Sequence, residues 1–263
     1  MNRTLWFAAL AVALSLFCTT LSADDKGDNK QDEKAPMRVL LVTGGHWFDR
    51  ENLSKMILDR PNTTLTEIEL PADQDKLRAG ITNDFDVLVF HDQSRFELSD
   101  EQKKNLEAMW AEGTPTVMLN HALIAHNDFP LFRNVYGTAF LIAPMKIDEK
   151  EYPGSTYKHP TEVNFHFVNK EHPITAGLAD FTLTDEVFGN LWLADDNDVL
   201  IETDHPESSR PICWTRWYEK SPVFVLIQGH DGVAFGDARY REIFYRGLDW
   251  VVTQGALKKR LTR

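Results

Sequence analysis

Short apolar runs that end at a histidine recur along the chain. The first run, at residues 39–43, stops at a glycine pair and is followed by His46. Further runs at 87–90, 116–119 and 223–227 lead to His91, to Asn120 and His121, and to His230. Such runs are typical of strands buried on both faces of a sheet. Because the carboxyl ends of neighbouring parallel strands line one crevice, the pattern predicts a histidine-rich pocket there.

Helical segments separate several of these strands. Apolar residues at helical spacing predict a helix over 49–58. A second helix begins with a capping box of Ser99 and Gln102 and stops at Gly113, and the last helix covers about 237–252. Helices that alternate with apolar strands indicate an α/β fold with a mostly parallel central sheet.

The remaining elements are shorter. Five prolines interrupt residues 129–180, so we expect only a short helix at 131–136 and an inserted strand at 162–168 in that region. Further strands are predicted at 64–70, 199–203 and 212–217, with a hairpin turn at 218–222. The chain is therefore expected to form one domain with an insertion.

The N-terminus has the features of an export signal. Arg3 precedes a short apolar stretch, which is followed by small residues. This pattern predicts cleavage after Ser22 or Ala23. The stretch is shorter than the roughly 20 residues that cross a bilayer, so no stable membrane span is expected. The predicted organisation is a signal peptide at 1–23, a disordered linker at 24–36, the domain at 37–255 and a C-terminal tail at 256–263. The mature protein is expected to be periplasmic or extracellular.

Charge and cysteine content argue against some binding partners and some kinds of site. The formal net charge is -12, and the first cluster of basic residues is the short run 258–260, which makes nucleic acid an unlikely partner. Without the signal peptide, Cys213 is the only cysteine, so neither an intramolecular disulfide nor a thiolate zinc site can form.

Six short motifs in order resemble the ThuA-like (trehalose utilisation) family over residues 37–252. They are Thr43–His46, Leu119–Ala122, Glu171–Gly177, Thr184–Gly189, Thr203–Pro206 and Gln228–Asp231. The resemblance implies a class I glutamine amidotransferase-like fold, which is a flavodoxin-like three-layer sandwich. Amidotransferases of this fold carry a cysteine nucleophile in the turn that corresponds to Leu119–Ala122, where this chain has none. The resemblance therefore implies carbohydrate metabolism, with a disaccharide or keto-sugar as substrate, and not glutamine hydrolysis.

The candidate catalytic residues are His46, His121, Glu186 and His230. One hypothesis is a divalent metal such as zinc, held by His46, His121 and His230, because nitrogen and oxygen ligands suffice without sulfur. The alternative is a metal-free site in which a histidine is the general base and Glu186 or Asp231 is the acid. Either site would suit a sugar-directed hydrolase or lyase. Asp185 and Glu186 are adjacent, so only one of them can point into the pocket.

Other residues near the strand ends are candidates for binding a small-molecule carbohydrate: Gly44, Gly45, Trp47, Asp92, Asn120 and Asp231. The glycine pair either brings backbone amides to a ligand or only permits a tight turn. His172 and His205 precede prolines and are expected in turns, whereas His126, His159 and His166 are expected at the surface. The rival hypothesis for function is a non-catalytic carbohydrate-binding module, which would need aromatic platforms but no reactive geometry.

Overall fold

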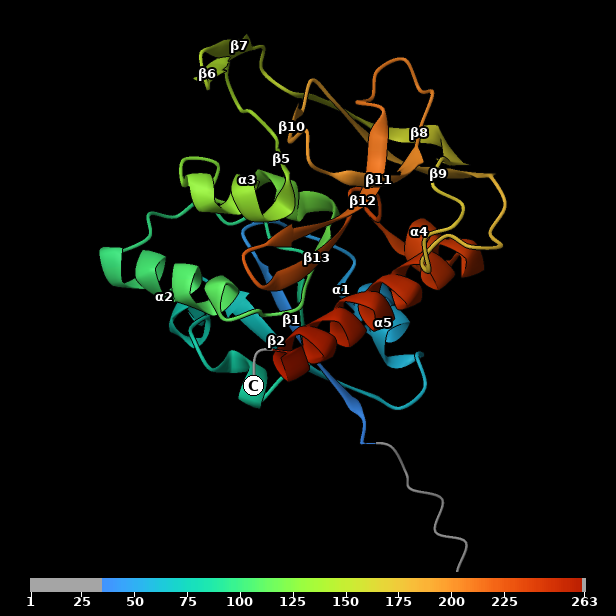
Figure 1. Cartoon of the computed structure of the whole chain (residues 1–263). Coiled ribbons are helices and arrows are strands. Elements are labelled where there is room, and N and C mark those ends of the chain that lie inside the picture. The colour runs from blue at the N-terminus through green and yellow to red at the C-terminus, as the bar shows by residue number, and fades with distance from the viewer. Residues whose placement is uncertain (1–34, 262–263) are drawn as a thin grey trace, which may run out of the picture. The chain divides into compact units, whose positions relative to one another are not determined.

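A nine-stranded mixed sheet forms the centre of residues 35–261, which are the residues that the computed structural model describes (Figure 1). The strand order is β2-β1-β3-β4-β13-β12-β11-β8-β9. The first five strands are parallel: β2 (Thr63–Leu70), β1 (Met37–Gly44), β3 (Val87–Phe90), β4 (Thr116–Leu119) and β13 (Ser221–Leu226). The other four are antiparallel: β12 (Pro211–Tyr218), β11 (Asp198–Glu202), β8 (Thr156–Phe167) and β9 (Phe181–Gly189).

The sheet confirms a mixed α/β fold, but the prediction of a mostly parallel sheet holds at one end only. The physical reason lies in the connections. Only Glu219 and Lys220 separate β12 from β13, and so short a loop can join two strands only in antiparallel orientation. Two small antiparallel pairs stand apart from the main sheet: β5 (Thr138–Ala139) with β10 (Trp192–Leu193), and β6 (Met145–Ile147) with β7 (Lys150–Tyr152).

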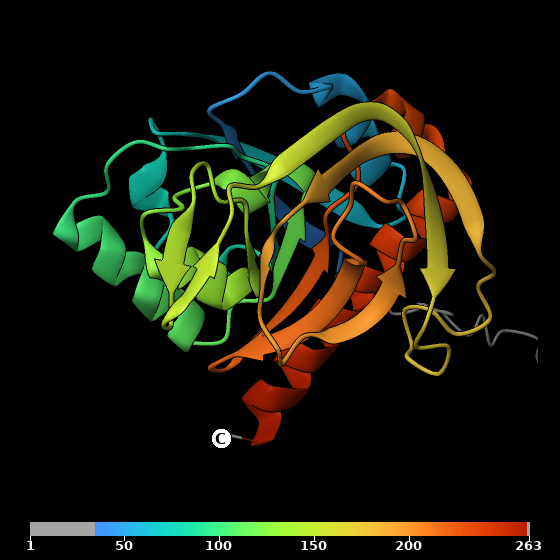
Figure 2. The same cartoon turned by 90° about the horizontal axis from the view of Figure 1, so that it is seen from above.

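Helices cover both faces of the sheet. They are α1 (Arg50–Leu58), α2 (Asp100–Ala111), α3 (Pro130–Tyr136), α4 (Gly232–Gly236) and α5 (Ala238–Leu261). Helix α5 contacts β3, β4 and β13, whereas α3 contacts β12 and β13. In Figure 2, α2 and α3 lie on one side of these strands, and α1 and α5 lie on the other. Every residue of β3, β4 and β13 is accordingly buried, as the apolar runs predict.

The predicted capping box at the start of α2 is present. The Ser99 hydroxyl accepts a hydrogen bond from the Gln102 amide, and the Gln102 side chain accepts one from the Ser99 amide. Two of the four amides that a helix start leaves unpaired are thereby satisfied. The short helix α3 and the turn between β12 and β13 also agree with the sequence predictions.

Two predictions of element bounds are wrong, and one long strand was not predicted. Strand β8 begins at Thr156 and not near residue 162, and β9 was not predicted as a separate element. Both strands pair with each other along their length, and this pairing overrides the proline inside β8. Helix α5 continues to Leu261 and does not end near residue 252. The predicted signal peptide and nearly all of the predicted linker lie outside the described residues.

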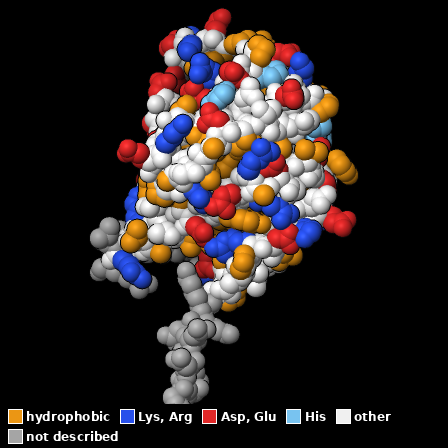
Figure 3. All heavy atoms as spheres, turned by 90° about the vertical axis from the view of Figure 1, so that its right-hand side faces the viewer, with side chains coloured by type: hydrophobic (Ala, Val, Ile, Leu, Met, Phe, Trp, Pro, Cys, Tyr) orange, Lys and Arg blue, Asp and Glu red, His pale blue; other side chains and the backbone are white. Residues whose placement is uncertain are grey.

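The surface of the described chain adds two observations. Within residues 35–261, every helix is either too short or too polar to cross a lipid bilayer. Figure 3 shows one face of the molecule, on which basic side chains are interspersed with acidic ones. This face therefore presents no continuous basic patch among the described residues.

Candidate functional site

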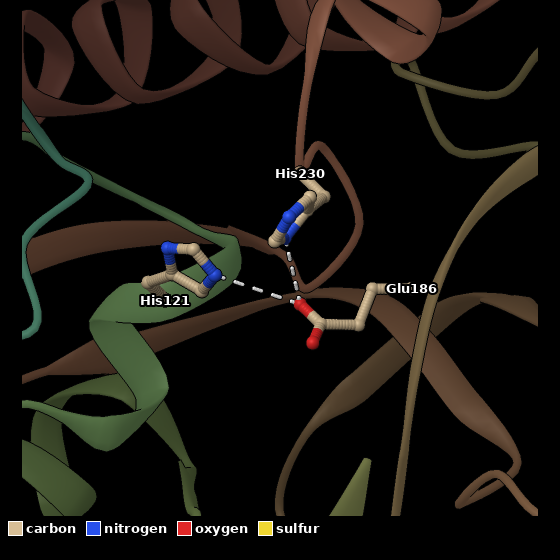
Figure 4. A group of neighbouring side chains, drawn as sticks. All are labelled: His121, Glu186 and His230. Atoms are coloured by element: carbon tan, nitrogen blue, oxygen red, sulfur yellow. Dashed lines mark hydrogen bonds and ion pairs between the residues drawn. The ribbon is translucent and has the colours of Figure 1, made fainter. Parts of the chain in front are cut away.

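His121, Glu186 and His230 meet at the carboxyl ends of the parallel strands (Figure 4). Glu186 Oε2 lies 3.1 Å from His230 Nδ1 and 3.6 Å from His121 Nε2. One nitrogen or oxygen atom of each side chain lies within 4.8 Å of the others. The structure thus brings together three of the four candidate catalytic residues, and we call them the His-Glu-His cluster.

Three separate elements position these side chains. His121 lies in the 3-10 helix Asn120–Ile124, which follows β4 directly. His230 lies in the loop between β13 and α4, and Glu186 comes from β9 on the antiparallel side of the sheet. Asn120, with φ of 36°, donates its side-chain amide to the Ile227 carbonyl at 3.2 Å and to Glu186 at 3.4 Å. Asn120 therefore ties the loops after β4 and β13 to the carboxylate.

Asp185 and Glu186 are adjacent in β9, so their side chains point in different directions and have different roles. Glu186 faces the two imidazoles, whereas Asp185 accepts hydrogen bonds from the backbone amides of Gly229 at 2.8 Å and His230 at 3.1 Å. Burial raises the pKa of Asp185 to about 6, although these backbone amides oppose the shift. Asp185 is thus a positioning residue, because it fixes the loop that carries His230.

The electrostatics of the cluster favour an ionised carboxylate. Burial raises the pKa of Glu186, but the hydrogen bonds from His121 and His230 outweigh it and lower this pKa to about 2. The hydrogen bond to Glu186 raises the pKa of His230, which favours the charged imidazolium. Burial lowers the pKa of His121 and favours its neutral form. The cluster therefore offers one anionic oxygen between a neutral and a more basic imidazole.

His46 lies at the rim of the cluster and not within it. Its ring centroid is 4.7 Å from that of His121, but the side chain is exposed and its Nδ1 contacts the Trp47 carbonyl. The set of close ligand atoms includes Glu186 in its place. The predicted three-histidine ligand set is therefore replaced, in geometric terms, by two histidines and a glutamate.

His91 adjoins the cluster, and Asp92 is the next residue in the chain. The His91 ring is 5.5 Å from the His121 ring, and its Nε2 lies 3.2 Å from the Gly229 carbonyl. Burial lowers the pKa of His91 to about 3 and raises that of Asp92 to about 6. Asp92 is completely buried, so it does not line the surface of the site.

The remaining predicted substrate-binding residues are Trp47, Asp231 and the glycine pair Gly44 and Gly45. Trp47 is 74% exposed, and Asp231 caps α4 by accepting a hydrogen bond from Val233. The glycine pair serves close backbone packing. A Cβ on Gly44 would meet the backbone of Leu70, and one on Gly45 would meet that of Gln93.

His159 is exposed, as predicted, but it also contacts the cluster, which was not predicted. Its ring centroid lies 4.0 Å from that of His230, and its Nε2 lies 3.5 Å from an Asp231 carboxylate oxygen. A bulge in β8 sets residues 159 and 160 opposite Glu186, because Lys158 pairs with Val187 and Thr161 with Asp185. A bulge re-aims a side chain in this way, and the sequence gives no signal for it beyond a proline inside the strand.

His172 and His205 have the turn roles that were predicted. His172 Nδ1 accepts a hydrogen bond from the Ile174 amide at 3.2 Å, and His205 Nδ1 accepts one from the Glu207 amide at 3.1 Å. Both imidazoles thus cap the backbone two residues downstream of their own position.

His126, by contrast, is buried and not at the surface, which corrects the prediction. Its ring packs between Phe96 and Phe132, with centroids 4.9 Å and 4.7 Å away. Burial lowers its pKa to about 4 from an ordinary value of 6.5. Between these values the unfolded chain binds a proton that the folded protein does not, so stability falls as the pH falls from about 6.5 to 4.

We expect His126→Phe to weaken this pH dependence. The free energy of unfolding of the wild type should fall by up to about 1.4 kcal/mol more per pH unit than that of the variant over this window. Urea denaturation at several pH values measures the difference. His166→Gln is the control, because ion pairing with Asp180 raises the pKa of His166 and gives a contribution of opposite sign. Parallel pH profiles for the wild type and His126→Phe would contradict the expectation.

The fold and the cluster define a class of protein: a mixed α/β domain with a histidine and carboxylate site at the ends of its parallel strands. Residues 38–251 match the family model of ThuA, described as trehalose utilisation, and the chain belongs to this family. A comparison with curated proteins gave no match.

Solved structures agree with this assignment at the level of the fold. A structure from Parabacteroides merdae that is named ThuA-like has a TM-score of 0.68 and 18% identity, covering 83% of this chain and 90% of its own. One from Bacteroides uniformis, also named ThuA-like, has a TM-score of 0.62 and 18% identity over 83% and 92% of the two chains. The cytoplasmic protein STM3548 from Salmonella typhimurium has a TM-score of 0.58 and 13% identity over 82% and 99%.

Proposed function

We propose that this ThuA family protein is a carbohydrate-directed hydrolase or lyase whose reaction takes place at the His-Glu-His cluster, with a divalent metal such as zinc bound there. The observation that carries the proposal is the convergence of His121, Glu186 and His230 within 4.8 Å. The family description, trehalose utilisation, supports a disaccharide or keto-sugar as substrate. Export from the cytoplasm is part of the proposal and rests on the N-terminal sequence alone.

We also propose that the fold has a flavodoxin-like core of the glutamine amidotransferase-like type. The five parallel strands, counted in chain order, have the order 2-1-3-4-5 that is typical of flavodoxin-like sheets. In such sheets ligands bind outside the carboxyl ends of the strands, which is where His121 and His230 lie. A cysteine nucleophile is excluded from the described part of this site because Cys213 lies buried in β12.

The donor set fits a zinc-type centre. Two imidazoles and one carboxylate are the protein ligands of several catalytic zinc sites, which keep a fourth position open for water or substrate. A bound divalent ion would supply Lewis-acid chemistry and lower the pKa of a bound water. Asn120 orients the Glu186 carboxylate by its hydrogen bond, and Asp185 fixes the His230 backbone, as outer partners of metal ligands do.

The proposal favours an enzyme over a non-catalytic binding module because an imidazole and a carboxylate lie within hydrogen-bond reach of one point. Glu186 Oε2 and His230 Nδ1 are 3.1 Å apart, and His121 approaches the same oxygen from the other side. Buried groups with shifted pKa values that meet in this way are typical of reactive sites. The metal-free alternative uses the same residues, with His121 as general base and His230 as the charged partner.

Metal binding tests the proposal. We expect the purified protein, loaded with Zn²⁺ and desalted, to retain about one ion per chain, which is the stoichiometry of a single three-ligand site. Zn²⁺ at about 100 times its dissociation constant should add about 2.7 kcal/mol to the free energy of unfolding, and EDTA should remove this gain. Elemental analysis and thermal denaturation measure both effects.

His121→Ala should lose the ion and the thermal effect of EDTA. His166→Ala is the matched control, since the His166 imidazole is exposed and pairs with Asp180 away from the cluster. Activity is to be screened against disaccharides and 3-keto sugars. Retention of the same zinc content by His121→Ala would refute the metal site. Loss of activity in that variant without any metal in the wild type would favour the metal-free mechanism, and sugar binding without turnover would favour the binding module.

A further inference from the structure

A groove of about 520 Å³ lies beside the cluster and is not used by the reaction proposed above. Its lining includes Arg95, Ile124, Phe140, Ile142 and Tyr157. The volume is within the range of about 300–1,000 Å³ that is typical of small-ligand sites. Tyr157 is 70% and Ile142 is 58% exposed, so both present apolar surface that no neighbouring element covers.

The chain places this groove next to the His-Glu-His cluster. Ile124 belongs to the same 3-10 helix as His121. Tyr157 lies two residues before His159, whose ring is 4.0 Å from that of His230. A bulge lies between Lys158 and Thr161, so the regular alternation of faces does not extend from Tyr157 to His159, but the two residues remain neighbours along β8. A ligand held at the cluster can therefore extend along β8 into the groove.

The pairing of β8 with β9 decides the face on which Tyr157 lies. Tyr157 pairs with Phe188, and residues directly opposite each other share one face of an antiparallel ribbon. Phe188 lies two residues beyond Glu186, so Tyr157 is on the face of the ribbon that carries Glu186. Figure 2 shows this ribbon as two long, curved strands that run side by side.

Arg95 is the charged side chain in the lining of the groove. Among the described residues, it makes no hydrogen bond or ion pair, although its side chain is exposed in the groove lining. Other arginines, such as Arg38 and Arg239, pair with a carboxylate. An unpaired guanidinium binds carboxylate and phosphate groups through two parallel hydrogen bonds. Arg95 therefore supplies a cation with which an anionic group on a ligand can pair.

We propose that the groove is a second sugar subsite, in which Tyr157 and Ile142 contact the apolar face of a sugar ring and Arg95 binds an anionic group on that ring. The inference rests on the proposed carbohydrate function and names its substrate class, which is a disaccharide or glycoside with a carboxylate or phosphate on one ring. The first ring lies at the cluster, and the charged ring lies in the groove.

Isothermal titration calorimetry at fixed ionic strength tests the subsite with three probes: trehalose, its uronic acid derivative and trehalose 6-phosphate. We expect the wild type to bind at least one anionic probe about tenfold or more tightly than trehalose, as a charge-assisted hydrogen-bond pair predicts. Arg95→Met should remove this preference and leave the affinity for trehalose within about twofold. The preferred anionic probe identifies carboxylate or phosphate as the recognised group.

Arg210→Met is the matched control, because Arg210 is exposed, pairs with Glu202 and does not line the groove. It should keep the anion preference, whereas Tyr157→Ala should weaken the binding of all three probes. Equal affinity for the neutral and anionic probes, a preference that survives in Arg95→Met, or no binding of any probe would overturn the subsite. Anion-selective binding without metal or turnover would instead overturn the proposed catalysis and leave the subsite in place.

Discussion

Replacing Glu186 with glutamine is expected to reduce turnover of a responsive sugar by a factor of about 10² to 10⁴, because the variant loses the carboxylate proposed as a metal ligand and as the partner of the base His121, and positioned acid and base groups contribute in this range. Glutamine keeps the size of the side chain but removes the charge that both imidazoles contact at 3.1 Å and 3.6 Å. The pKa of His230, which the hydrogen bond to Glu186 raises, should then fall toward its ordinary value. Steady-state kinetics and the pH dependence of kcat/KM measure both changes.

The control for this substitution is Glu162→Gln on the neighbouring strand β8. Glu162 is exposed and lies outside the cluster, so its neutralisation should leave both turnover and the pH profile unchanged. Circular dichroism confirms that both variants are folded. Turnover in Glu186→Gln within about threefold of the wild type would show that the carboxylate is not part of the reaction, since even a modest acid or base contributes more.

The second large effect is expected for Gly44→Ala, which should lower the free energy of unfolding by about 3 kcal/mol. Gly44 has a φ of 131°, and a Cβ there would lie 2.9 Å from the Leu70 amide nitrogen and closer still to its carbonyl oxygen. Both contacts are to the backbone of the paired strand β2, which cannot move without breaking the parallel pairing. The melting temperature should fall by about 6 to 12 °C for a domain of this size.

Gly236→Ala is the matched control, because no atom lies within 4 Å of a Cβ at that position. Its free energy of unfolding should change by less than about 1 kcal/mol. Equal stability of Gly44→Ala and the wild type would mean that the glycine pair is not required for packing. The role in ligand binding through backbone amides would then be the better explanation for this pair.

The sequence predicted the parallel half of the fold well for a physical reason. Strands β1, β3, β4 and β13 are buried on both faces, and this requires continuous apolar runs that are visible without a structure. The histidines that follow these runs were found by the same logic, because parallel strands end at one edge of the sheet. His46, His91, His121 and His230 do lie near one another there.

The antiparallel half was harder to predict. Strand β9 supplies Glu186, and β8 supplies His159, yet neither strand is a continuous apolar run, and β8 contains a proline. Their pairing with each other and the bulge near His159 come from contacts between segments far apart in the chain. Local propensity carries no information about such contacts.

The sequence alone determined which residues follow the buried strands, because the order of apolar and polar residues shows where each buried strand ends. It therefore also determined that imidazoles gather at one edge of the sheet. Only the tertiary structure decided that Glu186 takes the place of His46 beside His121 and His230. That choice depends on the curvature of β9 and on the backbone hydrogen bonds that Asp185 accepts from Gly229 and His230. Distances of a few ångströms between distant segments are set by packing, which no local pattern specifies.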